Sequence, residues 1–206
     1  MDTPYAAWAN RRQGMMPPDP GGTFGACGFL SGKEDTMKLT PLIDRLRDNA
    51  LTFQGITRSV PTEMARWKPS PEQWSILEVV NHLADEEVSD FRTRLDLTLH
   101  RPDEAWPAID PPEWAVERRY NDRDLPESLE RFLLEREKSV AWLSRLSSPD
   151  WGRAHQHSRF GAIRAGDLMT SWVAHDFMHI RQINRVHYQY LTQELSPYPT
   201  RYAGDW

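Results

Sequence analysis

Two histidines four residues apart, His175 and His179, are the strongest chemical feature of the sequence. On a helix such residues lie one above the other, because four steps of about 100° exceed a full turn by only ~40°. Two imidazoles placed in this way can bind one metal ion. The same helical stripe continues through residues of apolar character, namely Leu168, Trp172, Ile183, Val186 and Tyr190. An unpaired imidazole is costly on such a core-facing stripe, so two interpretations stay open: a metal site, or two core histidines hydrogen-bonded to facing helices.

A third histidine, His82, lies at the edge of the apolar face of an earlier helical segment, among Val79, Leu83 and Glu86. Three neutral imidazoles from two helices of one bundle leave one or more coordination positions open, as a catalytic ion requires. On its own, however, His82 is better interpreted as a half-exposed histidine at the boundary of the core.

Carboxylates near these histidines are candidates for supporting chemistry. Asp85 and Glu86 follow His82 by one turn, and either could orient an imidazole or act as a general base. We take Glu86 as the candidate catalytic residue and interpret Asp85 as a solvated helix charge. Asp176 points about 100° away from His175, which suits a surface or interface carboxylate as well as a role in supporting the site.

The remaining histidines give weaker indications. His155 and His157 share a polar loop and could line a substrate entrance, although such residues are more often simply exposed. Three residues could contact an anionic substrate: Arg159, Arg164 and Trp172. His100 and His187 are typical of helix-end or surface positions.

Two other metal sites fit the sequence less well. The segment from His175 to His179 is similar to the zinc-protease motif H-E-x-x-H, but it carries Asp in place of Glu, and the shorter side chain would misplace the general base. A di-iron carboxylate bundle requires two Glu-x-x-His pairs, and the sequence contains none.

Four helical segments would position these residues, over about residues 41–60, 75–100, 126–146 and 167–191. The first has Thr40 as its cap and Pro41 at its first position, the second opens with the capping box formed by Ser75 and Glu78, and Asp124 lies near the cap of the third. With no clear series of strands, the simplest fold class is all-α, a four-helix bundle.

The segments between and beyond these helices are rich in glycine, proline and polar residues. A long loop over about 101–123 separates the second and third helices; it could run along the bundle or cover one end of it. A short β-hairpin is possible around 157–163, and residues 196–206 suggest an irregular tail. Residues 1–36 hold more than half of the eleven glycines and are expected to form a flexible extension. The bundle domain would then span 37–206, with Met37 as a candidate natural start.

Composition restricts the partners. The net charge is -5 and no run of lysine or arginine occurs, which disfavours nucleic acid and anionic lipid as partners. The only cysteine, Cys27, can form no internal disulfide. No apolar run approaches the roughly 20 residues of a membrane span, and no apolar signal core is found near residue 1. We therefore expect a cytoplasmic protein.

Two motifs carry a resemblance to a known family. Residues 74–84, with the sequence WSILEVVNHLA, and residues 172–183, with the sequence WVAHDFMHIRQI, resemble the second-helix and last-helix motifs of the DinB-like superfamily of metal-dependent enzymes, also called YfiT-like. The similarity covers roughly residues 38–190. It implies a four-helix bundle, a divalent ion such as zinc or nickel bound by His82, His175 and His179, and a homodimer.

The resemblance also suggests a reaction. The family includes bacillithiol- and mycothiol-dependent transferases and a maleylpyruvate isomerase. We therefore expect a thiol-dependent S-transferase in which the ion activates a small-molecule thiol for attack on an electrophilic substrate. The alternatives are a metal-dependent hydrolase and a metal-binding stress-response protein without turnover.

Overall fold

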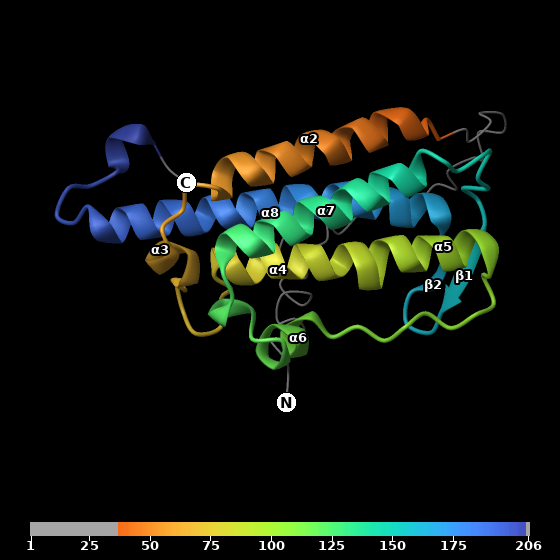
Figure 1. Cartoon of the computed structure of the whole chain (residues 1–206), viewed down its shortest axis with the longest axis horizontal. Coiled ribbons are helices and arrows are strands. Elements are labelled where there is room, and N and C mark those ends of the chain that lie inside the picture. Colours follow the sequence, from red (N-terminus) through yellow and green to blue (C-terminus); the bar gives the residue numbers. More distant parts are fainter. Residues whose placement is uncertain (1–36, 205–206) are drawn as a thin grey trace, which may run out of the picture. The chain divides into compact units, whose positions relative to one another are not determined.

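The computed structural model describes residues 37–204, and the structural statements below refer to this part of the chain. The extension predicted for residues 1–36 lies outside the described residues. Long helices dominate (Figure 1): α2 (Leu39–Thr57), α4 (Ile76–Glu86), α5 (Arg92–His100), α7 (Leu125–Leu143) and α8 (Ala165–Glu194). A π-helical turn, η2 (Glu87–Phe91), joins α4 to α5 in one continuous rod. The predicted all-α four-helix bundle is confirmed.

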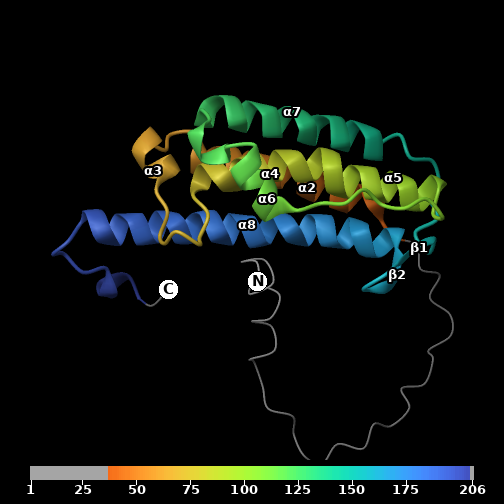
Figure 2. The same ribbon diagram turned by 90° about the horizontal axis from the view of Figure 1, so that it is seen from below.

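The order of the four rods around the bundle explains the long connection. Helices α2 and α4–α5 lie on opposite sides, and each packs against both α7 and α8 (Figures 1 and 2). Helices α5 and α7 run in the same direction, so the chain must return along the whole bundle between them. Residues 101–124 make this crossover, which includes α6 (Pro111–Glu117) and a 3-10 turn, η3 (Tyr120–Asp122).

The helix ends follow local chemistry. Ser75 Oγ accepts a hydrogen bond from the Glu78 amide at 3.1 Å, and the Glu78 carboxylate accepts one from the Ser75 amide at 2.8 Å, so the predicted capping box is confirmed. At the start of α7 the side chain of Asp124 accepts a hydrogen bond from the Glu127 amide at 3.0 Å, which is a single cap without the reciprocal bond. The cap predicted at Thr40 is wrong: α2 begins at Leu39, and Pro41 is tolerated there because the amides of a first turn need no helical partner.

Smaller elements complete the described chain. Helix α2 ends at Thr57 instead of Val60, and a short helix, α3 (Thr62–Arg66), follows Pro61. The possible hairpin is present as β1 (Ala154–His157) and β2 (Gly161–Arg164), paired antiparallel. In the tail, a 3-10 turn, η4 (Arg201–Ala203), interrupts the predicted irregular structure. No helix between Met37 and Gly204 combines the length and apolar character needed to span a membrane.

The core consists of two apolar clusters with a polar layer between them. One cluster is built around Phe53, Leu83, Phe132 and Ile183, and the other around Leu46, Phe91, Val140 and Trp172. On every rod, polar residues separate the members of the two clusters. These buried residues are Asn49 on α2, Glu86 and Glu87 at the α4–η2 junction, Arg136 on α7, and Asp176 and His179 on α8. The candidate site therefore lies in the middle of the bundle.

Candidate metal centre

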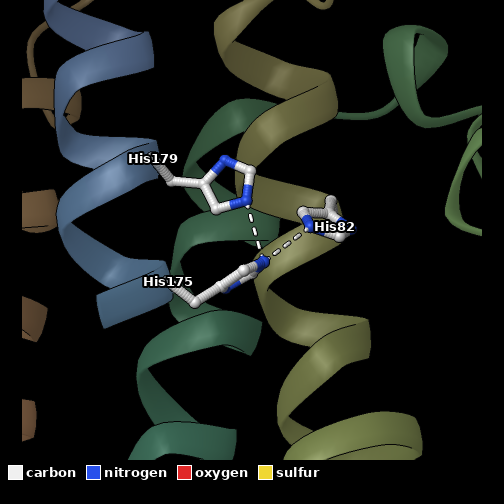
Figure 3. A group of neighbouring side chains, drawn as sticks. All are labelled: His82, His175 and His179. Atoms are coloured by element: carbon white, nitrogen blue, oxygen red, sulfur yellow. Dashed lines mark hydrogen bonds between the residues drawn. The ribbon is translucent and has the colours of Figure 1, made fainter. Parts of the chain in front are cut away.

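The three predicted histidines meet between α4 and α8. His82 projects from α4, and His175 and His179 project from α8, with all three rings pointing toward one another (Figure 3). His175 Nε2 lies 3.4 Å from His82 Nε2 and 3.0 Å from His179 Nε2. One ligand atom from each residue lies within 4.8 Å of the other two. His82 and His179 are buried, and His175 is partly exposed.

These distances suit a divalent ion. Nitrogen ligands at ~2.0–2.1 Å in tetrahedral geometry are about 3.3 Å apart, close to the separations of 3.0 and 3.4 Å found here. Hydrogen bonding alone satisfies the cluster poorly. His175 Nε2 faces two ring nitrogens but offers either one proton or one lone pair, so it can form a full hydrogen bond with only one of them. An ion would satisfy all three nitrogens.

The tautomer of His179 is favourable for metal binding. Its Nδ1 lies 2.7 Å from Gln182 Oε1. An amide oxygen only accepts hydrogen bonds, so Nδ1 is the donor and Nε2 keeps its lone pair for the cluster. Gln182 belongs to the last-helix motif, but its spacing of three residues from His179 on one helix is the only sequence signal for this role.

Burial keeps the three imidazoles neutral. It is the main cause that lowers the pKa of His82 and of His175 well below the usual value, and the nearby His179 lowers both further. For His179, burial lowers the pKa to about 4, although Gln182 and Asp176 act in the opposite direction. Since a metal competes with protons for these nitrogens, neutral rings are ready to bind an ion at neutral pH.

Glu86 lies beside this cluster, as the sequence suggested. Its Oε1 is 3.6 Å from His82 Nδ1, and neither atom has a hydrogen-bond partner among residues 37–204. Burial raises the pKa of Glu86 well above the usual value, and the neighbouring carboxyl of Asp90 raises it further. Burial also raises the pKa of Asp90, against the influence of Arg94, whose guanidinium lies 3.0 Å away. Glu86 is therefore a buried carboxyl group that binds a proton more tightly than an exposed glutamate does.

Two aromatic residues outside the predicted set enclose the histidines. Trp74 meets the His82 ring edge to face at 4.8 Å, and Phe91 meets the His175 ring at 5.1 Å. Phe91 ends the π-helical turn, where the side chain of Thr93 donates to the Val88 carbonyl at 2.6 Å. The sequence contains no recognisable signal for this turn. Glu86, the residue before it, lies beside His82, and Glu87, its first residue, pairs with Arg136.

The interpretation of Asp85 as a solvated charge is wrong. Asp85 is buried and accepts hydrogen bonds from Tyr120, Arg118 and Arg131. Burial alone would raise the pKa of Asp85, but the bonds from Tyr120 and Arg131 lower it overall. Asp85 therefore attaches the crossover to α4 and α7.

Asp176 is also buried, which excludes the surface alternative. It points away from the histidines and pairs with Arg136, whose two terminal nitrogens each lie 2.7 Å from one of its oxygens.

The weaker candidates form no part of the three-histidine cluster. Trp172 is a core residue whose Nε1 donates to Glu87 at 2.8 Å, so it does not face a substrate. His155 is buried, stacks on Trp106 of the crossover at 4.4 Å and contacts the Pro102 carbonyl, which contradicts simple exposure.

Among the other candidates, His157 tilts toward Phe160 and Arg159 is exposed. Arg164 pairs with Asp167. His100 is exposed at the end of α5, and His187 is partly buried against the Ile56 carbonyl.

Two hollows of about 400 and 500 Å³ lie near α3 and the end of α8, and both are lined by Met64, Asn184 and His187. None of the three clustered histidines lines either hollow.

Comparisons with known proteins agree with this architecture. The family model of the DinB superfamily matches residues 42–183. A similar solved structure is that of YfiT from Bacillus subtilis, described as a probable metal-dependent hydrolase with an unusual four-helix bundle topology. It has a TM-score of 0.67 and 19% sequence identity, over 79% of this chain and 94% of that chain. At this identity the likeness shows the fold alone. No curated protein matches the chain.

Proposed function

The chain belongs to the DinB superfamily, and on this premise we propose that it is a metal-dependent enzyme that activates a thiol for S-transfer. His82, His175 and His179 would hold one divalent ion, zinc or nickel. The observation that carries the proposal is the convergence of three ring nitrogens at 3.0 and 3.4 Å, with one nitrogen left unsatisfied by hydrogen bonding. Three neutral ligands compensate none of the charge of the ion and leave positions open to an anionic ligand.

When bound, such an ion lowers the pKa of a thiol or water and so supplies a nucleophile near neutral pH. The residues of the chain supply orientation and proton transfer. Gln182 fixes the His179 ring through its 2.7 Å contact with Nδ1. Glu86 Oε1 is the acceptor for the proton that the substrate releases. In the proposed transfer the S–H bond breaks, the proton moves to Glu86, the sulfur bonds to an electrophilic carbon, and the leaving group departs with its electron pair.

Hydrolysis is the second candidate. It is favoured by the likeness to YfiT, which is described as a probable metal-dependent hydrolase. The same residues would serve: water would replace the thiol, and Glu86 would accept its proton. The two candidates therefore differ in the nucleophile and share the site.

A paired assay separates these activities. The metal-loaded protein is incubated with a chromogenic electrophile, chlorodinitrobenzene, and with bacillithiol, mycothiol, glutathione or cysteine. Chromogenic esters and amides without thiol are tested in parallel. We expect a metal-dependent rate with at least one thiol that chelation or His175→Ala abolishes and His100→Ala leaves intact. If none of the thiols gives a metal-dependent rate, S-transfer is rejected. Hydrolysis without thiol would then support the second candidate, and bound metal without turnover would indicate a metal-binding protein.

The homodimer implied by the resemblance stays a prediction. Light scattering of the purified full-length chain tests it directly, since a dimer has twice the mass of the 24.0 kDa chain.

A further inference from the structure

A buried cluster of three charged side chains lies beside the three histidines. Arg136 of α7 is 2% exposed, Glu87 of η2 is 1% exposed and Asp176 of α8 is fully buried. Arg136 Nε donates to Glu87 Oε1 at 2.9 Å, and a terminal nitrogen of Arg136 lies 2.8 Å from the same oxygen. Its terminal nitrogens also donate to both oxygens of Asp176 at 2.7 Å. One guanidinium thus joins two carboxylates from two different helices.

The position of Asp176 on α8 determines what this cluster can do. Asp176 lies between the two histidines in sequence, and its side chain projects about 100° around the axis from His175 and about 60° from His179. Helix α7 holds its carboxylate through Arg136. Helix α2 holds it too, since Asn49 Nδ2 donates to Asp176 Oδ2 at 3.0 Å. Rotation of α8 about its axis would break these bonds. The bonds therefore hold α8 in the orientation that directs His175 and His179 toward α4.

Glu87 connects the same cluster to the helix that carries His82. It lies five residues after His82 on the continuous α4–η2 rod. Its Oε1 accepts from Arg136 and also from Trp172 Nε1 of α8 at 2.8 Å. Glu87 therefore joins its own rod to α8 in two ways. It accepts directly from Trp172, and it shares the guanidinium of Arg136 with Asp176.

We propose that Asp176, Arg136 and Glu87 are positioning residues that preorganise the three histidines for metal binding. Buried ion clusters can often be replaced by apolar side chains without loss of stability, so stability alone does not account for this arrangement. Positioning of the metal site does account for it. The cluster fixes the rotation of α8 and its spacing from α4, and these two quantities set the separations of the ring nitrogens. The inference rests on the proposed metal site and concerns how that site is held.

Cobalt binding to the full-length chain tests the proposal, because Co²⁺ is a spectroscopic substitute whose visible absorption reports coordination geometry. Asp176→Asn keeps the shape of the side chain and removes the charge that holds Arg136. We expect Co²⁺ affinity, measured by chelator competition, to fall about tenfold to a hundredfold, and the visible spectrum to change. The matched control is Leu143→Ala, which removes a fully buried side chain of α7 in the second apolar cluster. It should lose stability and keep both the affinity and the spectrum.

A second variant keeps the test possible if Asp176→Asn does not fold. Glu87→Gln keeps an oxygen that can accept from Arg136 and Trp172, so it should fold, and we expect a smaller loss of affinity with the same spectral change. It carries the test alone if Asp176→Asn is insoluble. Wild-type affinity and spectrum in every folded variant of this pair would overturn the inference and leave the proposed function standing. Failure of the wild-type chain to bind Co²⁺ would instead contradict the metal site itself.

Discussion

Replacement of Asp85 by alanine should weaken the fold through the crossover. Asp85 is 2% exposed and accepts from the hydroxyl of Tyr120, which is itself fully buried. Alanine leaves that hydroxyl without its partner, at a cost of about 2 kcal/mol. Arg118 and Arg131 also lose their carboxylate, but their side chains are 36% and 38% exposed, so water screens them and each adds only about 0.5 kcal/mol. The free energy of unfolding should therefore fall by about 3 kcal/mol.

Urea denaturation followed by circular dichroism measures this loss, and hydrogen exchange locates it. The matched control is Asp122→Ala, in the same crossover, whose side chain is 62% exposed and pairs with an exposed arginine; its loss should stay within about 0.5 kcal/mol. Asp85→Asn keeps an acceptor for Tyr120 and should lie between the two variants. Amides of residues 101–124 should exchange faster in Asp85→Ala than in the wild type. If Asp85→Ala loses no more stability than Asp122→Ala, the attachment of the crossover through Asp85 is refuted.

The bonds to Asp85 also predict a pH dependence. Tyr120 and Arg131 lower the pKa of Asp85 in the folded protein. A lowered pKa means that the unfolded chain binds the proton more readily, so this contribution is present above the unfolded pKa of about 3.9 and is lost as pH falls through the folded pKa. The loss in Asp85→Ala should therefore be constant between pH 8 and 5, and a difference that disappears within this range would contradict the assignment.

Three further outcomes follow. Glu86→Gln should lower kcat about a hundredfold or more with metal content unchanged, while Glu135→Gln on α7 keeps full activity; equal kcat in both would remove Glu86 from the mechanism. In the metal-free protein, the ring signals of His179 in NMR should stay constant from pH 8 to 5 and move near its pKa of about 4. Its share of the unfolding free energy is complete above pH 6.5 and falls by about 1.4 kcal/mol per pH unit between pH 6.5 and the folded pKa of about 4; titration near pH 6.5 would refute its burial. Gly161→Ala, at a φ of 73°, should destabilise by about 1 kcal/mol, whereas Gly55→Ala in α2 should stabilise by up to about 1 kcal/mol; calorimetry that gives both changes the same sign would contradict this.

Local patterns were sufficient to predict much of the fold and the pairing of His175 with His179. The capping box of Ser75 and Glu78 involves residues three apart, and the pairing of His175 with His179 involves residues four apart, so helical geometry alone fixes both. The apolar stripes identified the four rods. The position of His82 was predicted through the family resemblance, because an isolated histidine at the edge of a stripe does not reveal what it faces.

Contacts between distant segments could not be predicted in this way. Asp85 follows helical spacing like any exposed charge, and it is buried only because Tyr120, 35 residues later, returns over it with the crossover. Arg136 and Asp176 are 40 residues apart, and their pairing depends on the order of the helices around the bundle. The π-helical turn at Glu87–Phe91 interrupts the α-helical hydrogen-bond pattern of its rod, and the sequence contains no recognisable signal for it.

The metal content of the full-length chain tests the central claim most directly. Purified protein is loaded with zinc or nickel, freed of excess by gel filtration and analysed by plasma mass spectrometry beside His82→Ala, His175→Ala and His179→Ala, with exposed His100→Ala as the control. We predict about one ion per chain in the wild type and in His100→Ala, and a clear loss in each of the other three variants. No bound ion in the wild type, or full occupancy in the three variants, would contradict the account.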